Sequence, residues 1–286
     1  MRKSSIFCGT DLTASASLAA RRAQRIAREL DLRFVLAHVV PEYLTLSAHA
    51  LVPPQYGTRL STGGRRGGAA VETTAKRHLG MLGSWIEKLE LAPDATRVLV
   101  GRTHDEILAA ARAARSRLIV TGVHRGESRA KSLLLGTTTD RLLRKSDVPI
   151  LLARTNPKRA YTTAVVAVDL GDMSASVLAA ARAFAPEAKL HVLYVLHGSA
   201  KGAMTVASAR SRLEALAGEV EGVDCTATVL EGDPRKRILA FAERRRASLV
   251  VVGTRARKGL ERLMLGSVAE FVLRSADVDV LAVPPS

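Results

Sequence analysis

The sequence predicts an α/β fold of two tandem open α/β sandwich domains, each a mainly five-stranded parallel sheet with helices on both faces. Apolar runs such as 118–122 and 249–253 lack polar alternation, which is typical of parallel strands buried on both faces. The longer stretches 118–153 and 249–283 repeat one order of strand, glycine turn, basic loop, glycine with a hydroxyl residue, helix and strand. The 286 residues also suit two domains of roughly 150 residues.

The first half opens with a β-α-β pattern. An apolar run at 4–12 precedes a helix predicted at 14–32, where apolar residues recur at helical spacing. A second strand follows at 33–40, and such a crossover makes the two strands parallel. We then expect a helix at about 70–91 and a strand at 96–101 that ends in glycine.

The second half repeats these elements in the same order. We expect a strand at 163–170, a helix at 174–185 and a strand at 189–196. A helix at about 203–219 and a strand at 226–232 follow, and the last strand again ends in glycine.

A further helix follows that glycine in each half, and its start has capping residues. We expect Thr103 to cap the first of these helices and Asp233 to cap the second. Pro234 would then occupy the first helical position, where its missing N–H costs nothing.

The spacing between matching residues locates an insertion. Asp11 and Asp169 are 158 positions apart, whereas Gly101 and Gly232 are 131 apart, so the first half has 27 extra residues between these points. The segment 41–72, with its glycine- and arginine-rich part at 63–68, lacks periodicity and is predicted to be this inserted loop. We therefore expect domains at 1–154 and 161–286, joined by a linker at 155–160.

The charge is strongly basic but unevenly distributed. The net charge is +16, of which residues 1–155 hold 25 basic minus 13 acidic side chains, or +12. These charges are scattered along helices and only 3% of the residues are aromatic, a pattern that disfavours nucleic-acid binding. No apolar run reaches the roughly 18 residues of a membrane span and no signal peptide is evident, so we expect a cytoplasmic protein without membrane contact.

Cysteine and histidine residues give no metal-binding pattern. Cys8 and Cys225 lie in strands predicted to be buried, one in each half, so neither a disulfide nor a metal site is expected. His38 and His191 lie in predicted strands without the spacing of metal ligands.

The repeated glycines predict a phosphate cradle. Gly253 directly follows a strand, where the missing side chain permits a tight turn, and Gly266 with Ser267 opens a helix. The unpaired N–H groups and the positive dipole of a helix start favour an anion. In the alternative interpretation, the glycines only make turns and Ser267 only caps its helix. Asp11 and Asp169 also directly follow a strand. Each carboxylate is interpreted either as a ligand-binding group or as part of a turn.

The ordered motifs resemble those of the universal stress protein family. Its nucleotide-binding members have Gly, two residues, Gly, nine residues and Gly-Ser/Thr, with an Asp ending the first strand. This chain carries CGTDL and VAVDL at the first strands, LGT and LGS at the helix starts, and DVPILLA and DVDVLAV at the last strands. The resemblance covers essentially the whole chain twice and implies a Rossmann-like fold similar to the adenine nucleotide α-hydrolases.

The resemblance also implies an adenine-nucleotide site in each half, with ATP, and Mg²⁺ beside it, as the ligand. The first-half residues that match the family's site are Thr10, Asp11, Val39, Gly122, Gly126, Gly136, Thr137 and Thr138. The second-half residues are Val168, Asp169, Val195, Val252, Gly253, Gly266, Ser267 and Val268. In this assignment the Asp lies against the adenosine and the glycines and hydroxyl residues hold the phosphates.

Each half departs from the family's pattern in a different way. Ala256 replaces the middle glycine of the second half, and an added methyl group obstructs a close approach of phosphate. In the first half three residues, instead of two, separate Gly122 from Gly126, but Arg125, Arg129 and Lys131 bring cations to the loop. We therefore expect two unequal sites, of which the first is better preserved.

These features predict a stress-responsive regulatory protein that binds ATP. No nucleophile with a base and an orienting group is evident, so no catalytic residue is assigned; at most we expect slow ATP hydrolysis or self-phosphorylation on Ser267 or Thr137. Tandem members of the family resemble fused dimers, so we expect the edge strands at 147–153 and 277–283 to join the halves and, in a homodimer, two chains. The alternatives are a nucleotide-free scaffold that binds a regulatory protein partner and a basic nucleic-acid-binding protein.

Overall fold

The computed structural model describes residues 3–41, 68–123, 135–157, 159–197, 204–218, 224–254 and 265–285. Most of the predicted inserted loop, together with Gly126 and Ala256, lies outside these residues. Contacts divide the chain into two compact units. Unit 1 is Met1–Val123 with Gly136–Leu142, and unit 2 is His124–Leu135 with Leu143–Ser286.

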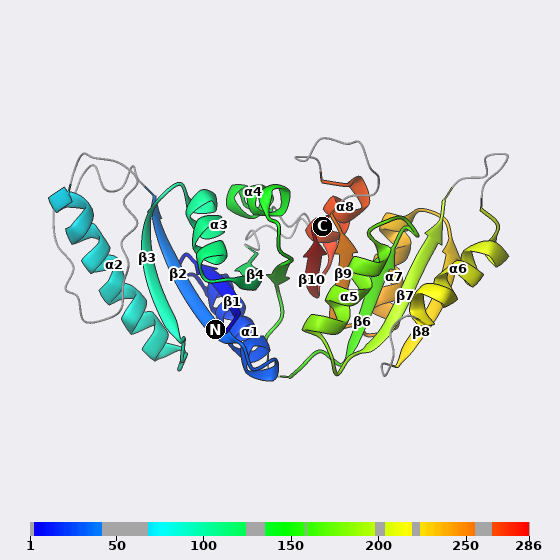
Figure 1. Cartoon of the computed structure of the whole chain (residues 1–286), viewed down its shortest axis with the longest axis horizontal. Coiled ribbons are helices and arrows are strands. Elements are labelled where there is room, and N and C mark those ends of the chain that lie inside the picture. Colours follow the sequence, from blue (N-terminus) through cyan, green and yellow to red (C-terminus); the bar gives the residue numbers. More distant parts are fainter. Residues whose placement is uncertain are drawn as a thin grey trace. The chain divides into compact units, whose positions relative to one another are not determined.

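Unit 1 contains a parallel sheet of four strands in the order β3-β2-β1-β4 (Figure 1). Its elements along the chain are β1 (Ser5–Thr10), α1 (Ala14–Glu29), β2 (Arg33–Pro41), α2 (Gly68–Lys88), β3 (Ala95–Gly101), α3 (Thr103–Ala113), β4 (Ser116–Gly122) and α4 (Thr137–Lys145), whose last turn belongs to unit 2. The strand order reverses between β1 and β4, and ligands of such sheets bind at the carboxyl ends of the strands at that point.

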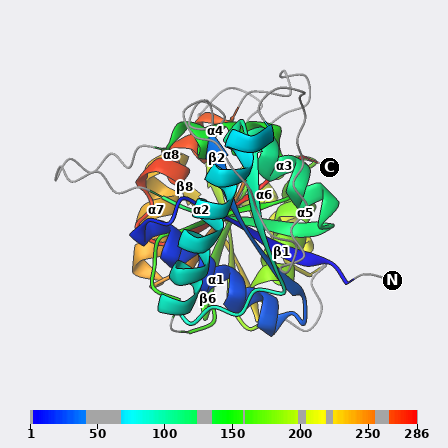
Figure 2. The same cartoon turned by 90° about the vertical axis from the view of Figure 1, so that its left-hand side faces the viewer.

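Helices cover both faces of the unit 1 sheet. On β1, Gly9 faces α3, because a side chain there would lie 2.9 Å from the Ile107 side chain. On β2, His38 faces α2, where it contacts His78. Gly9 is paired with Ala37, the neighbour of His38, so α2 and α3 lie on opposite faces (Figure 2).

Unit 2 contains strands in the order β5-β10-β9-β6-β7-β8. Its elements are β5 (Ile150–Ala153), β6 (Thr163–Val168), α5 (Ser174–Phe184), β7 (Lys189–Leu196), α6 (Val206–Gly218), β8 (Cys225–Glu231), α7 (Pro234–Arg244), β9 (Leu249–Gly253), α8 (Ser267–Ser275) and β10 (Asp279–Val283). The pairs from β10 to β8 are parallel, and the order reverses between β6 and β9. Tandem α/β organisation with mostly parallel strands is thereby confirmed.

The closing strand of the first half pairs with that of the second half, inside unit 2. β5 lies antiparallel to β10, with Leu151 opposite Leu281. The carboxylate of Asp279 is fully buried and accepts the N–H groups of Arg154 and Thr155 at 2.8 and 2.9 Å. The hydroxyl groups of Thr155 and Tyr161 donate to the same carboxylate at 2.9 and 2.7 Å. Asp279 therefore fixes the segment that follows β5 against the start of β10.

Local features agree with the sequence in part. Asp233 caps α7, accepting the N–H of Arg235 at 3.0 Å, as predicted. Thr103 does not cap α3: it is the first helical residue, and Arg102 in the capping position makes no side-chain bond. Both cysteines are free thiols, with Cys8 buried and Cys225 half-buried. Among the described helices, none has the length and apolar character of a membrane span.

Candidate functional site

A cavity of about 190 Å³ lies at the carboxyl ends of the unit 2 strands. Strands β6, β7 and β9 and the starts of α5, α7 and α8 line it. All eight residues that the sequence placed in the second site lie on its wall: Val168, Asp169, Val195, Val252, Gly253, Gly266, Ser267 and Val268. They come from sequence positions up to 100 residues apart, and the structure brings them together at the point where the strand order reverses.

Asp169 begins the turn that leads from β6 to the cavity. Its Oδ1 accepts the N–H of Gly171 at 2.9 Å and the hydroxyl of Ser174 at 3.4 Å, so it does stabilise a turn. Leu170 between them has a φ of 55°, in the left-handed region that a leucine rarely adopts. The Asp169 carboxylate is exposed, and Oδ2 accepts no hydrogen bond from the described residues, so it is available to a ligand.

The start of α8 has the geometry of an anion site. Gly266 is the capping residue and Ser267 is the first residue of the helix, so the interpretation of Ser267 as a cap is wrong. Gly266 donates its N–H to the carbonyl of Thr254 at 2.8 Å, which holds the helix start beside the end of β9. Ser267 is exposed, and a glycine cap offers no side chain to the first-turn N–H groups.

The rest of the cavity wall is mainly apolar. Val168, Val195 and Val252 are buried at the strand ends. Tyr194 and Ile238 also line the cavity and were not predicted from the sequence. Tyr194 precedes Val195 on β7, and Ile238 lies one helical turn after Pro234, which is also on the wall. A wall of this kind with a few polar groups is typical of small-molecule sites.

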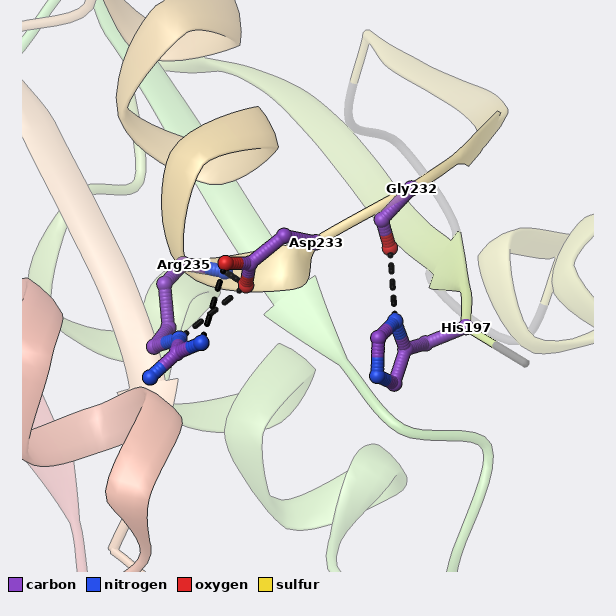
Figure 3. Close-up of polar contacts among 4 residues, drawn as sticks. All are labelled: His197, Gly232, Asp233 and Arg235. Atoms are coloured by element: carbon purple, nitrogen blue, oxygen red, sulfur yellow. Dashed lines mark hydrogen bonds and ion pairs between the residues drawn. The ribbon is translucent and has the colours of Figure 1, made fainter.

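Short-range polar contacts fix the segment before α7, next to the cavity-lining Pro234 (Figure 3). His197 donates from Nδ1 to the carbonyl of Gly232 at 3.2 Å. Gly232 has a φ of 125°, a conformation that favours glycine. Arg235 donates to both carboxylate oxygens of Asp233, from Nε at 3.1 Å and from Nη2 at 3.0 Å. The hydrogen bonds from Arg235 lower the pKa of Asp233, and the same pair raises the pKa of Arg235.

The first-half residues lie in unit 1, except Gly126, which is outside the described residues. The described set is Thr10, Asp11, Val39, Gly122, Gly136, Thr137 and Thr138, at the ends of β1, β2 and β4 and the start of α4. Asp11 repeats the turn of its counterpart, accepting the N–H of Thr13 at 3.1 Å, and Leu12 has a φ of 64°. A side chain at Gly122 would lie 2.5 Å from the carbonyl oxygen of Ser15, whereas one at Gly136 would meet nothing within 4 Å.

A histidine pair in unit 1 was not foreseen. His38 Nδ1 donates to the carbonyl of Thr10 at 2.8 Å, and its Nε2 lies 2.9 Å from Nδ1 of His78. The two rings are stacked, with centroids 5.0 Å apart. Burial, followed by the charges of His38 and Arg77, lowers the pKa of His78 below its ordinary value of 6.5. The pair therefore adjoins the predicted nucleotide residue Thr10.

Comparisons with known proteins agree with the duplicated fold. The model of the universal stress protein family matches residues 4–154 and again 160–284. Universal stress protein YxiE of Bacillus subtilis is 29% identical over 147 residues, which are 43% of this chain and 99% of that protein. Universal stress protein MJ0531 of Methanocaldococcus jannaschii is 48% identical over 62 residues, 22% of this chain, and the match spans only 36% of that relative's length.

A solved structure matches both halves at once. The crystal structure of a universal stress protein from Archaeoglobus fulgidus covers 100% of both chains with a TM-score of 0.71 and 19% identity. At that identity the likeness shows the fold alone. Together with the family match over both halves, it leads to one conclusion: the chain belongs to the universal stress protein family, with two domains of that family in tandem.

Proposed function

We propose that this chain is a regulatory protein of the stress response that binds an adenine nucleotide, ATP with Mg²⁺, in the unit 2 cavity. The observation that supports it most is the convergence on one cavity of all eight second-half residues chosen from sequence. The sequence favoured the first half as the better-preserved site. Because the second-half residues line one cavity, we propose unit 2 as the principal nucleotide site.

The cavity wall suits the three parts of ATP. An apolar surface for the base is offered by Val168, Val195 and Val252, because the transfer of aromatic and aliphatic groups out of water is favourable. Asp169 offers a carboxylate that accepts hydrogen bonds from the sugar hydroxyls or an amino group. The N–H groups at the start of α8 and the hydroxyl of Ser267 offer donors for phosphate oxygens.

Titration calorimetry with separate substitutions in the two halves tests this proposal. Purified full chain is titrated with ATP and Mg²⁺, as wild type, Asp169→Ala and Asp11→Ala. We expect Asp169→Ala to weaken binding about tenfold or more, because a charged hydrogen-bond acceptor is lost, and Asp11→Ala to leave the unit 2 binding in place.

The outcomes separate the candidate functions. Loss of binding in Asp11→Ala with none in Asp169→Ala would move the principal site to unit 1. If millimolar ATP with Mg²⁺ gives neither heat nor a thermal shift in the wild type, the nucleotide function fails in favour of the scaffold. Tight binding of DNA or RNA that declines steeply with added salt would favour the nucleic-acid alternative.

A further inference from the structure

The first turn of α7 carries an unusual charge pattern. Arg235, Lys236 and Arg237 are exposed there and no acidic residue accompanies them, although the positive end of a helix dipole disfavours cations. The matching turn of α3 in unit 1 carries Asp105 and Glu106 instead, as the dipole favours. Unit 2 therefore has cations next to the cavity-lining Pro234, where the matching turn of unit 1 has carboxylates.

Arg235 lies between this turn and the start of α8. Its guanidinium carbon is 6.0 Å from the ring centre of Phe271 on α8. Helical side chains lean toward the N-terminus, so the Phe271 ring lies over the turn that begins at Ser267. Pro234, which directly precedes Arg235, lines the cavity together with Ser267. Figure 3 shows Arg235 extending from the first turn of α7 toward α8. Arg235 is not itself on the cavity wall, but it lies between Pro234 and α8, both of which border the cavity, and so its guanidinium is near the proposed phosphate donors.

Asp233 holds this arginine in a contact that is easily exchanged. The two side chains form a two-point ion pair, but 51% of the Arg235 side chain and 27% of the Asp233 side chain are exposed. Exposed ion pairs contribute little to stability, because water solvates both charges well. A phosphate offers the same two-point geometry with more negative charge, which a guanidinium fork matches well.

We propose that Arg235 makes the unit 2 site select nucleotides with a polyphosphate chain over nucleosides and monophosphates, by exchanging Asp233 for a terminal phosphate. This inference rests on the proposed nucleotide function of the same cavity. His104 occupies the matching position in unit 1, with its side chain 8% exposed and Nε2 3.2 Å from a carboxylate oxygen of Asp105. Unit 1 therefore lacks this arginine at the matching position.

The test compares ATP, AMP and adenosine by titration calorimetry with the full chain. The variants of the α7 turn described below are each made in two background chains. The Asp11→Ala background measures binding to unit 2, and the Asp169→Ala background measures binding to unit 1. In the first chain, Arg235→Ala should lower ATP affinity about tenfold or more and change adenosine affinity by less than about twofold. Arg235→Lys should recover only part of the loss, because lysine lacks the planar fork. Lys236→Ala, which removes an equal charge from the same turn, should have little effect.

Asp233→Asn should change ATP affinity in the opposite direction to Arg235→Ala. Asparagine also caps helices well, so α7 keeps its start while the charge that competes for Arg235 is removed. ATP affinity should rise about twofold or more, with adenosine unchanged.

Several results would overturn the inference while leaving the nucleotide site intact. One is an equal loss of ATP affinity in Arg235→Ala and Lys236→Ala. Another is a loss of adenosine affinity in Arg235→Ala as large as its loss of ATP affinity. The third is the same loss of ATP affinity when Arg235→Ala is made in the Asp169→Ala chain. Binding of neither ATP nor adenosine by the wild type would instead refute the proposed function itself, and the inference with it.

Discussion

Two glycines of the unit 1 motif have different physical roles, and substitution separates them. A Cβ on Gly122 would lie 2.5 Å from a backbone oxygen of Ser15, which no rotamer change relieves. We expect Gly122→Ala to lower the free energy of unfolding by about 1–3 kcal/mol, the usual cost of overpacking. The matched control is Gly136→Ala, which meets nothing within 4 Å and should lose less than about 1 kcal/mol through poorer capping of α4. Urea unfolding followed by the fluorescence of Trp85, on α2 of unit 1, measures both; equal stability of the two variants would contradict the close contact.

The sequence identified eight of the residues that line the cavity, but not what each predicted site residue touches. A glycine at the end of a strand is visible as a local pattern, and so Gly122 and Gly253 could be placed. That Gly122 packs against Ser15 depends on how closely α1 approaches β4, which no local pattern encodes. The prediction that Thr103 caps α3 was wrong by one position. The reason is that backbone angles define where a helix starts, and neighbouring residues can share these angles.

At the scale of elements, the packing of α2 on β2 should depend on pH through the histidine pair. Burial lowers the pKa of His78, so the unfolded chain takes up a proton at a higher pH than the folded chain does. Stability should therefore decrease as the pH falls below about 6.5, the ordinary pKa of histidine.

Substitution of the half-buried His78 should reduce this dependence. Thermal unfolding of wild type and His78→Gln is compared at pH 7.5 and 5.5, where the variant should lose less stability on acidification. Arg77→Gln serves as a graded control, because the charge of Arg77 also lowers the pKa of His78 and its removal should weaken the effect only in part. An unchanged pH dependence in His78→Gln would show that the pair has no energetic weight.

Elements themselves were largely predictable, because their signals are local. The helix predicted at 14–32 is α1, with Thr13 as its cap and Ala19, Ala23 and Ile26 on its buried face. Pairings between distant segments were not predictable to the same degree. His38 and His78 are 40 residues apart, with the inserted segment between them. This separation is outside any helical or strand periodicity, so no local pattern relates the two residues.

At the scale of the whole molecule, the sequence repeat and the contacts divide the chain at different places. The family match ends its first copy at residue 154, whereas contacts place the division between Leu142 and Leu143. The reason is the antiparallel pairing of β5 with β10 and the buried carboxylate of Asp279. The repeat alone contains no information about which copy its last strand packs with; the pairing was expected instead from the edge positions of the strands at 147–153 and 277–283, and β5 does pair with β10.

Tyr161 gives a direct measure of this connection. Its hydroxyl donates to the buried carboxylate of Asp279 at 2.7 Å, so Tyr161→Phe should lower the free energy of unfolding by about 1.5–3 kcal/mol. Tyr194→Phe is the control, because that hydroxyl has no hydrogen bond among the described residues and should be removable at little cost. Far-ultraviolet circular dichroism in urea compares the two; an equal loss in both variants would refute the special role of Tyr161.

Two fragments test whether the second folding unit begins at the repeat boundary or includes β5. The fragment 161–286 follows the repeat but lacks β5 and the donors of Arg154 and Thr155, so Asp279 loses three of the four hydrogen bonds described above and retains that of Tyr161. We expect it to be less stable than the fragment 147–286 by about 3 kcal/mol or more, because a buried charge that loses its partners is costly. Asp279→Asn should then have unequal effects: it should destabilise 147–286, where four donors face the carboxylate, more than 161–286, where three of those donors are absent. Equal stability of the two fragments in urea, or an equal effect of Asp279→Asn in both, would show that the repeat boundary is also the folding boundary.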